Sequence, residues 1–262
     1  MPSCDGLNTW FISKYARSSG LKAALSGIGA DELFGGYPSF SRMRWIHYLH
    51  QWPRFIRKKS PFPVGSKFRR LQYLALPGIT GEYLTLRGHF LPDQISRILN
   101  MEESQVWDIL ERYSQEPGPS SLNSPARAGW MEMNLYLKNQ LLRDADAMGM
   151  KHGVEIRVPF LDSSLVQFCL SLHPSVRYSK NCSKKLLSDA CNDLVPDTIR
   201  NRPKMGFSLP YSPWLKKSSF IRGMVEDSGS RFAKVYADFQ KDRKSTRLNS
   251  SHEWISRMPS SA

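Results

Sequence analysis

Apolar residues recur every three to four positions through most of the chain, which is the period of a helix with one buried face. The stretch from Leu7 to Ser18 has this pattern, with Asp5 as a candidate N-cap and Gly20 as the end. Further helices are expected to open at Ser124-Pro125, after Asp162 and at Ser183. The Asp162 helix is predicted to end at Pro174, and the Ser183 helix to continue through Leu194 to Pro196. The chain is therefore predicted to be mostly helical.

One segment has a different pattern. The apolar run Leu21 to Leu25 predicts a strand, and it is followed by the small-residue loop Ser26–Gly29 and a new helix with Asp31 and Glu32 in its first turn. After Pro38 the sequence contains no convincing second strand of period two. The fold class predicted is α/β, with a helical bulk and no internal repeat.

Composition narrows the class of protein. Hydrophobic residues make up 40% and charged residues 23%, as in an ordinary globular chain. No apolar run approaches the roughly 18 residues of a membrane helix, and the first residues lack the pattern of a secretory signal. The four cysteines include no C-x-x-C pair, which argues against a disulfide framework and a zinc knuckle. A cytoplasmic protein without a membrane partner is expected.

The formal net charge of +14 is unusual. Residues 51–70 carry several Lys and Arg side chains and no acidic one. This run fits a solvated helix face with a proline-rich loop, and it also fits contact with an anionic partner such as polyphosphate, nucleic acid or acidic lipid. A basic helical nucleic-acid-binding module is therefore kept as an alternative of a different class.

The loop Ser26-Gly27-Ile28-Gly29 has the composition of a phosphate-binding turn. Its glycines would let backbone N–H groups come close to a ligand. Asp31 and Glu32 would repel a bare phosphate but could hold Mg²⁺ that bridges to it. The competing interpretation is that these acids only complement the helix dipole. From spacing alone, both interpretations stand.

The complete string SGIGADELFGGY resembles the S-G-x-G-x-D-E-x-F-G-G-Y signature of the asparagine synthetase family. Two later blocks are similar to that family in the same order: LLRDADAMGMKHGVEIRVPFLDSSLVQF and KKLLSDACNDLVPDTIRNRPKMGFSLPYSPWL. The resemblance implies an adenine nucleotide α-hydrolase-like synthetase domain of the N-type ATP pyrophosphatase kind. It implies an ATP-dependent carbon–nitrogen ligase that adenylates aspartate and transfers ammonia from glutamine to give asparagine, AMP and pyrophosphate.

The resemblance also implies roles for individual residues. Ser26, Gly27 and Gly29 match the nucleotide-binding loop, and Asp31 matches the acid that serves Mg²⁺ and pyrophosphate. Lys204 matches the family lysine that contacts phosphate and stabilises charge during acyl transfer, which makes it the predicted catalytic residue. Tyr37 completes the signature. Arg143, Asp144 and Asp146 could line the same cleft, and a solvated helix-face salt bridge explains them equally well. The stretch Arg157–Asp162 matches the family block, but it is interpreted as an apolar turn with an N-cap.

Two departures from the family pattern restrict these expectations. Position 28 is Ile, where studied members carry a Glu that serves as general base toward ammonia, and an aliphatic side chain cannot accept a proton. The S-G-G-x-D-S pyrophosphate loop and the N-terminal glutaminase are not found in the sequence. Residues 1–242 are therefore expected to be the C-terminal part of a longer synthetase domain that is inactive alone, receives ammonia from a separate glutaminase domain, and forms a homodimer at full length.

The sequence leaves the identity of the carboxylate substrate open. Because Ile28 replaces the general base, a paralogous amidotransferase or a β-lactam synthetase-like enzyme acting on another carboxylate is an alternative to asparagine synthesis. His47 and His50 could ligate a metal but lack a third ligand at useful spacing, and Cys182 and Cys191 are expected to be unreactive. Residues 243–262 have no amphipathic period and are expected to be a non-native, adaptor-like tail.

Overall fold

The computed structural model of the chain describes residues 4–50, 67–114, 119, 122, 124–179, 183–200 and 219. The chain divides into two compact units. Unit 1 contains Met1–Arg54 and Pro117–Leu209, and unit 2 contains Phe55–Glu116 and Pro210–Ala262.

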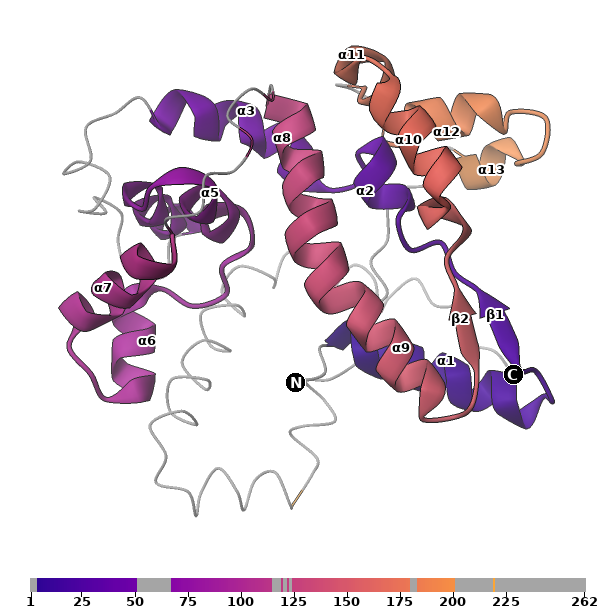
Figure 1. The fold of residues 1–262 in the computed structure, drawn as a ribbon, viewed down its shortest axis with the longest axis horizontal. Helices are drawn as coiled ribbons and strands as arrows, with labels where there is room; N and C mark the ends of the chain where they lie inside the picture. The colour runs from indigo at the N-terminus through magenta and orange to yellow at the C-terminus, as the bar shows by residue number, and fades with distance from the viewer. Residues whose placement is uncertain are drawn as a thin grey trace, which may run out of the picture. The chain divides into compact units, whose positions relative to one another are not determined.

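A continuous helical rod runs through unit 1 (Figure 1). It consists of α8 (Ser124–Met131), the π-helical segment η2 (Glu132–Leu141) and α9 (Leu142–Met150). The helix predicted from Ser124 is therefore confirmed, with the addition of π geometry in its middle, which single-residue periodicity does not reveal. Helix α3 (Pro38–His50) packs against α8, and α1 (Cys4–Ser18) packs against α9.

Helix α1 ends where the sequence predicts and begins earlier. Gly20 takes a left-handed backbone with φ of 80°, and the Leu21 N–H donates to the Ala16 carbonyl at 3.0 Å, which closes the helix end. At the other end the helix already includes Asp5, so that residue is not the N-cap. Its carboxylate instead accepts a hydrogen bond from the Tyr136 hydroxyl at 2.9 Å.

The described chain contains one parallel two-stranded sheet, formed by β1 (Ala23–Leu25) and β2 (Glu155–Arg157). The register pairs Ala24 with Ile156. Strand β1 is as predicted, whereas the expectation that no strand follows Pro38 is wrong. Strand β2 was missed because three residues cannot display a period of two and because its partner strand lies far away in the sequence.

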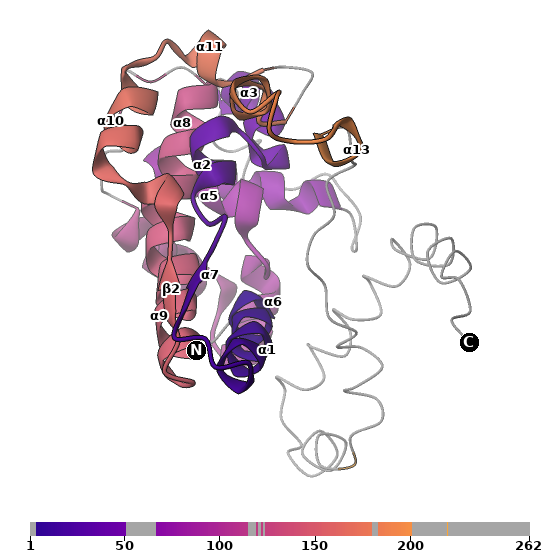
Figure 2. The ribbon, with the colours of Figure 1, turned by 90° about the vertical axis from the view of Figure 1, so that its right-hand side faces the viewer.

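After β2, short elements follow one another at the carboxyl end of the strands, with α1 at the opposite end (Figures 1 and 2). The 3₁₀ turn η3 (Pro159–Leu161) leads into α10 (Ser163–Ser171), which Asp162 caps by accepting hydrogen bonds from two backbone N–H groups at 3.0 and 3.2 Å. This confirms the predicted cap. Pro174 does not simply end α10, because it also opens the short helix α11 (Pro174–Arg177).

The helix predicted from Ser183 to Leu194 is wrong in extent. Helix α12 (Lys185–Ala190) ends earlier, and a turn separates it from α13 (Asp197–Arg200). Leu194 lies in that turn, 82% exposed, so its apolar side chain does not continue the buried face of α12. Leu186 and Leu187 of α12 do pack, against a core cluster made of Ala30, Leu33, Phe34 and Cys169.

The described part of unit 2 contains η1 (Lys67–Ala75), α5 (Gly78–Arg87), α6 (Pro92–Leu99) and α7 (Glu103–Tyr113). Its core cluster brings together Tyr73 and Trp107, whose ring centroids are 6.3 Å apart. Helix α5 approaches η1 closely at Gly81, where a Cβ would lie 2.6 Å from the Tyr73 carbonyl oxygen. Prolines stand at the helix starts, as the proline-broken pattern predicts.

Candidate functional site

The glycine-rich loop emerges from the carboxyl end of β1. The Ser26 N–H extends the pairing of the strands by donating to the Arg157 carbonyl at 2.8 Å, and the Ser26 hydroxyl accepts a hydrogen bond from the Ile28 N–H at 3.3 Å. Gly27 is exposed, and a Cβ built on it would meet no atom of the described residues within 4 Å. Among the described residues, open space therefore lies in front of the loop, at the edge of a parallel sheet where ligands of α/β proteins commonly bind.

Gly29 fixes the far end of the loop. Its φ of 100° is in the left-handed region, and a Cβ there would lie 2.6 Å from Leu161 Cδ2. Leu161 belongs to the R-V-P-F-L-D stretch, so the structure brings this stretch directly against the loop. The predicted role of Arg157–Asp162 as an apolar turn with an N-cap agrees with this packing. Arg157 itself is 61% exposed and pairs with Glu155, whose hydrogen bond raises the pKa of Arg157.

The Gly35-Gly36 pair holds Asp31 in place. Both glycine N–H groups donate to the Asp31 carbonyl, at 3.0 and 2.8 Å, and end α2 (Ala30–Phe34). The position of a Cβ on Gly36 would be 1.6 Å from Asp31 Oδ1, so the carboxylate occupies the space that a side chain on Gly36 would need. Glycine is required there to let the carboxylate lie against the backbone.

The same carboxylate oxygen contacts a lysine that sequence reasoning did not single out. Lys184 Nζ lies 3.3 Å from Asp31 Oδ1, with 35% and 25% of the two side chains exposed. A partly exposed ion pair of this kind stabilises a fold by about 0–1 kcal/mol. The pair is therefore weak enough to exchange partners. The only signal in the sequence is the Lys-Lys pair at the start of the KKLL block.

Glu32 lies on the buried face of α2, and only 1% of its surface is exposed. The Tyr37 hydroxyl donates to Glu32 Oε1 at 2.8 Å. Burial raises the pKa of Glu32 above its ordinary 4.5, the hydrogen bond from Tyr37 acts in the opposite direction, and the nearby Asp31 and Glu132 carboxylates raise it further. Burial and the Glu32 charge also raise the pKa of Tyr37. Glu32 is thus a buried structural partner of Tyr37, and Asp31 is the acid that solvent reaches.

The other acids of the predicted cleft lie along the rod. Asp144 is buried at the α1–α9 contact, where a Cβ on Gly6 would be 3.1 Å from its Cγ. Arg143 and Asp146 are exposed on α9. Tyr136 of η2 connects this region to the signature, since its ring lies edge-on to that of Tyr37 with centroids 6.0 Å apart.

Several predicted residues lie outside the described part of the chain. These include the catalytic candidate Lys204, Cys182, the tail from residue 243, residues 51–66 of the basic run, and the side chains of His47 and His50. Cys191 is half-buried. Within the described residues no group of three or more His, Cys, Asp or Glu side chains is arranged to hold a metal ion. None of the described helices is both long and apolar enough to cross a membrane.

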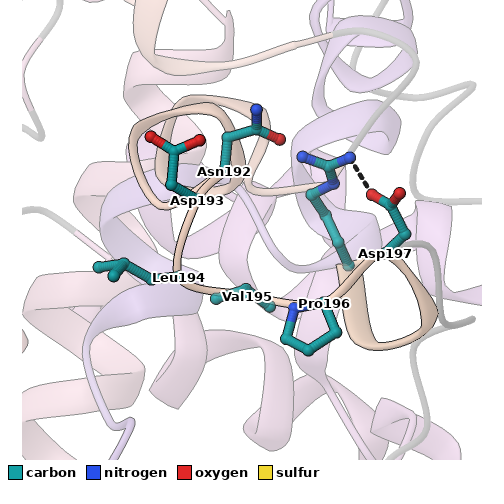
Figure 3. Close-up of a pocket in the computed structure, with 7 residues that line it drawn as sticks. Asn192, Asp193, Leu194, Val195, Pro196 and Asp197 are labelled. Carbon is teal, nitrogen blue, oxygen red and sulfur yellow. Dashed lines mark hydrogen bonds and ion pairs between the residues drawn. The ribbon is translucent and has the colours of Figure 1, made fainter.

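A surface hollow of about 460 Å³ lies elsewhere, between α12 and α13. Figure 3 shows that its lining comes from one stretch of chain, and the dashed line marks the ion pair between Arg200 and Asp197. Its lining residues are Asn192, Asp193, Leu194, Val195, Pro196, Asp197 and Arg200. No residue of the glycine-rich loop lines it, and a hollow made by a single local segment offers no convergent chemistry. The loop with Asp31 is therefore the stronger candidate site.

Known proteins resemble the chain over most of its length. It is 27% identical over 238 residues to asparagine synthetase [glutamine-hydrolyzing] 1 of Bacillus subtilis, covering 84% of this chain and 36% of that protein. A putative asparagine synthetase of Mycobacterium tuberculosis is 25% identical over 237 residues, covering 84% and 34%. Amidase chry2 of Gibberella zeae is 23% identical over 246 residues, covering 82% and 36%.

The chain spans about a third of the length of these curated relatives. No solved structure matches it. The sequence model of the asparagine synthase family matches residues 4–254, which include the loop, Asp31 and Lys184. The chain therefore belongs to the asparagine synthase family.

Proposed function

We propose that the chain carries part of the active site of an ATP-dependent amide-forming ligase, with the Ser26–Gly29 loop and Asp31 as its nucleotide-phosphate side. The observation that carries the proposal is the placement of Asp31. Its carboxylate lies against Gly36, and 25% of its side chain is exposed. The side chain lies next to the glycine-rich loop at the carboxyl edge of the parallel strands. Membership of the asparagine synthase family supports the same reaction class.

The residues present fit ATP and Mg²⁺. No described residue fills the space where a side chain on Gly27 would stand, which leaves room for phosphate oxygens to approach the backbone N–H groups. Asp31 supplies the kind of oxygen ligand that Mg²⁺ takes beside substrate phosphates. When bound, ATP would activate a carboxylate for attack by ammonia. In this proposal the loop orients the phosphates, Asp31 holds the metal ion, and Lys204 neutralises negative charge during acyl transfer.

Aspartate is the proposed carboxylate, because the relatives with asparagine synthetase names suggest it. A second candidate is another carboxylate. It is favoured by Ile28, whose half-buried aliphatic side chain cannot accept a proton from ammonia, and by the relatives named amidases. A glutaminase partner that delivers ammonia, a homodimer and a cytoplasmic location stay predictions. No observation on the described residues favours the nucleic-acid alternative.

The test is carboxylate-dependent release of pyrophosphate from ATP, measured with Mg²⁺ and ammonia on the complete product of the gene that encodes this chain. Aspartate and a panel of other carboxylates are offered separately. Pyrophosphate and AMP formed in equal amounts with one amide product would support the proposal, and the productive carboxylate would name the substrate. Release of ADP and inorganic phosphate, or no release with any carboxylate, would contradict it.

A further inference from the structure

Helix α3 has one buried face and one exposed face. It packs against α8 (Figure 1), and its buried residues are Ser39, Met43 and Ile46. Trp45 and Tyr48 lie on the opposite face, and they are 71% and 64% exposed. Because three residues separate them along the helix, the two rings are neighbours on its surface. Exposed apolar side chains that lie together, rather than scattered singly, mark sites of contact with a partner.

Two arginines flank this aromatic pair. Arg42 precedes Trp45 by three residues, Arg44 precedes Tyr48 by four, and both arginines are exposed. With about 3.6 residues per turn, Arg42 lies to one side of the two rings and Arg44 to the other. Neither arginine forms an ion pair with an acidic side chain of the described residues. The α3 face, formed by these four residues, therefore has an aromatic centre and cationic margins.

Acidic residues are missing from α3 and from the helix packed against it. Neither the sequence of α3 nor that of α8 contains Asp or Glu, and α8 adds Arg127. Between Glu32 and Glu82 the chain carries nine Lys or Arg residues and no acidic one. The formal charge of the whole chain, +14, has the same sign. An anionic partner is therefore attracted to the α3 face.

The arrangement of groups on the α3 face favours a lipid surface over a nucleic acid. A nucleic acid presents phosphates along its outer edge, which favours cations at the centre of a contact face. A lipid bilayer instead has an apolar region beneath a layer of headgroups. Aromatic rings at the centre of a helix face can enter that region while flanking arginines reach the headgroup phosphates. Trp and Tyr are enriched at this depth because each combines an apolar ring with one polar group.

We propose that the α3 face is a docking site for the anionic surface of a lipid bilayer. The helix lies in the plane of the interface and does not cross the bilayer. Trp45 and Tyr48 supply the apolar contact, and Arg42 and Arg44 supply an electrostatic attraction that salt weakens. The expectation of no membrane partner came from the lack of a spanning apolar run, which does not bear on surface binding. This proposal is independent of the function proposed for the glycine-rich loop.

The experiment is vesicle flotation of the complete product of the gene that encodes this chain. The vesicles contain phosphatidylcholine alone or equal parts of phosphatidylcholine and phosphatidylglycerol. The proteins are the wild type and three double variants: Trp45→Ala with Tyr48→Ala, Arg42→Gln with Arg44→Gln, and Tyr15→Ala with Arg17→Gln. The last variant is the control, because it removes an exposed aromatic ring and an exposed arginine from α1.

We expect the wild type to float with the anionic vesicles at low salt, to release them at high salt, and not to float with phosphatidylcholine alone. The arginine variant should bind the anionic vesicles about tenfold more weakly or less, since each cation near such a surface contributes severalfold. The aromatic variant should show a loss of similar size, and the control should match the wild type. Circular dichroism checks the folding of each variant, and all the substituted side chains are exposed.

Two results would overturn the proposal: no binding of the wild type to anionic vesicles, or binding that either α3 variant leaves unchanged. A fluorescent single-stranded oligonucleotide is titrated in parallel. If the wild type bound the oligonucleotide but not the vesicles, and the α3 variants lost that binding, the partner would be a nucleic acid and the lipid proposal would be wrong. Release of pyrophosphate from ATP tests the proposed ligase function separately.

Discussion

Asp31 Oδ1 lies 1.6 Å from the position that a Cβ on Gly36 would take, so the signature glycine and the signature acid share one space. The Gly36 N–H also donates to the Asp31 carbonyl at 2.8 Å. Contact with the Gly36 backbone therefore fixes the orientation of the Asp31 carboxylate before any ligand binds. A metal–phosphate site needs this pre-organisation.

Gly36→Ala should displace the Asp31 carboxylate and weaken magnesium pyrophosphate binding. The added methyl group would overlap the carboxylate, with an expected loss of stability of about 1–3 kcal/mol, as for overpacking. Calorimetry gives the affinity and urea unfolding gives the stability. Gly153→Ala is the control, because its Cβ would meet no described atom within 4 Å but its φ of 63° adds strain. Gly153→Ala should lose stability but keep its affinity for magnesium pyrophosphate. If Gly36→Ala kept the wild-type affinity, Gly36 would not fix the position of the Asp31 carboxylate.

Substituting the two loop glycines by alanine should affect binding and stability differently. Gly27→Ala places a methyl group where no described atom lies within 4 Å, so the melting temperature should stay unchanged while the approach of phosphate is hindered. Gly29→Ala combines φ of 100° with a Cβ 2.6 Å from Leu161 Cδ2, so the fold itself should lose stability, by about 1–3 kcal/mol. Thermal unfolding and pyrophosphate titration of both variants make the comparison. Equal melting temperatures for the two variants would count against the described loop packing.

Glu32 should make stability depend on pH. Because the folded state raises the pKa of Glu32 above 4.5, the folded state binds more protons than the unfolded state, and this contribution to stability is lost as pH rises through the folded pKa. Glu32→Gln keeps an oxygen that can accept from Tyr37 and removes the titration. The free energy of unfolding of Glu32→Gln, relative to that of the wild type, should therefore increase as pH rises above 4.5. Urea unfolding from pH 4.5 to 8 measures the difference, and parallel profiles would refute this role of Glu32.

A side chain added at Gly129 in the helical rod should overlap Tyr178. A Cβ on Gly129 would lie 2.2 Å from the Tyr178 hydroxyl oxygen and 3.2 Å from its Cζ. Gly129→Ala should therefore destabilise the fold by about 1–3 kcal/mol. Adding Tyr178→Phe removes the nearer atom and should recover part of the loss. A double-mutant cycle by urea unfolding measures this coupling, and additive effects would show that the two residues do not meet.

Local features of the fold could be predicted from the sequence, and non-local ones could not. The strand–loop–helix around Ser26 and the Asp162 cap follow from residue types a few positions apart. Strand β2 was missed because Glu155 and Arg157 are exposed and its pairing depends on a strand more than a hundred residues earlier. No local pattern encodes that partner.

The candidate site divides in the same way. The resemblance identified Ser26, Gly27, Gly29 and Asp31 as a group, and the structure places them on one loop and helix. The contact of Lys184 with Asp31 depends on a left-handed backbone and on the packing of α12, neither of which has a periodic signal. Lys204 stays a prediction from the family pattern.

In the proposed function, backbone N–H groups of the loop bind nucleotide phosphates beside Asp31. The most direct test is a two-dimensional amide NMR spectrum of the complete product of the gene that encodes this chain, labelled with ¹⁵N-glycine and recorded during titration with magnesium ATP. We expect the Gly27, Gly29 and Gly36 signals to shift in a saturable way while the remote Gly153 signal stays in place. Saturable shifts at other glycines, with Gly27 and Gly29 unmoved, would contradict it.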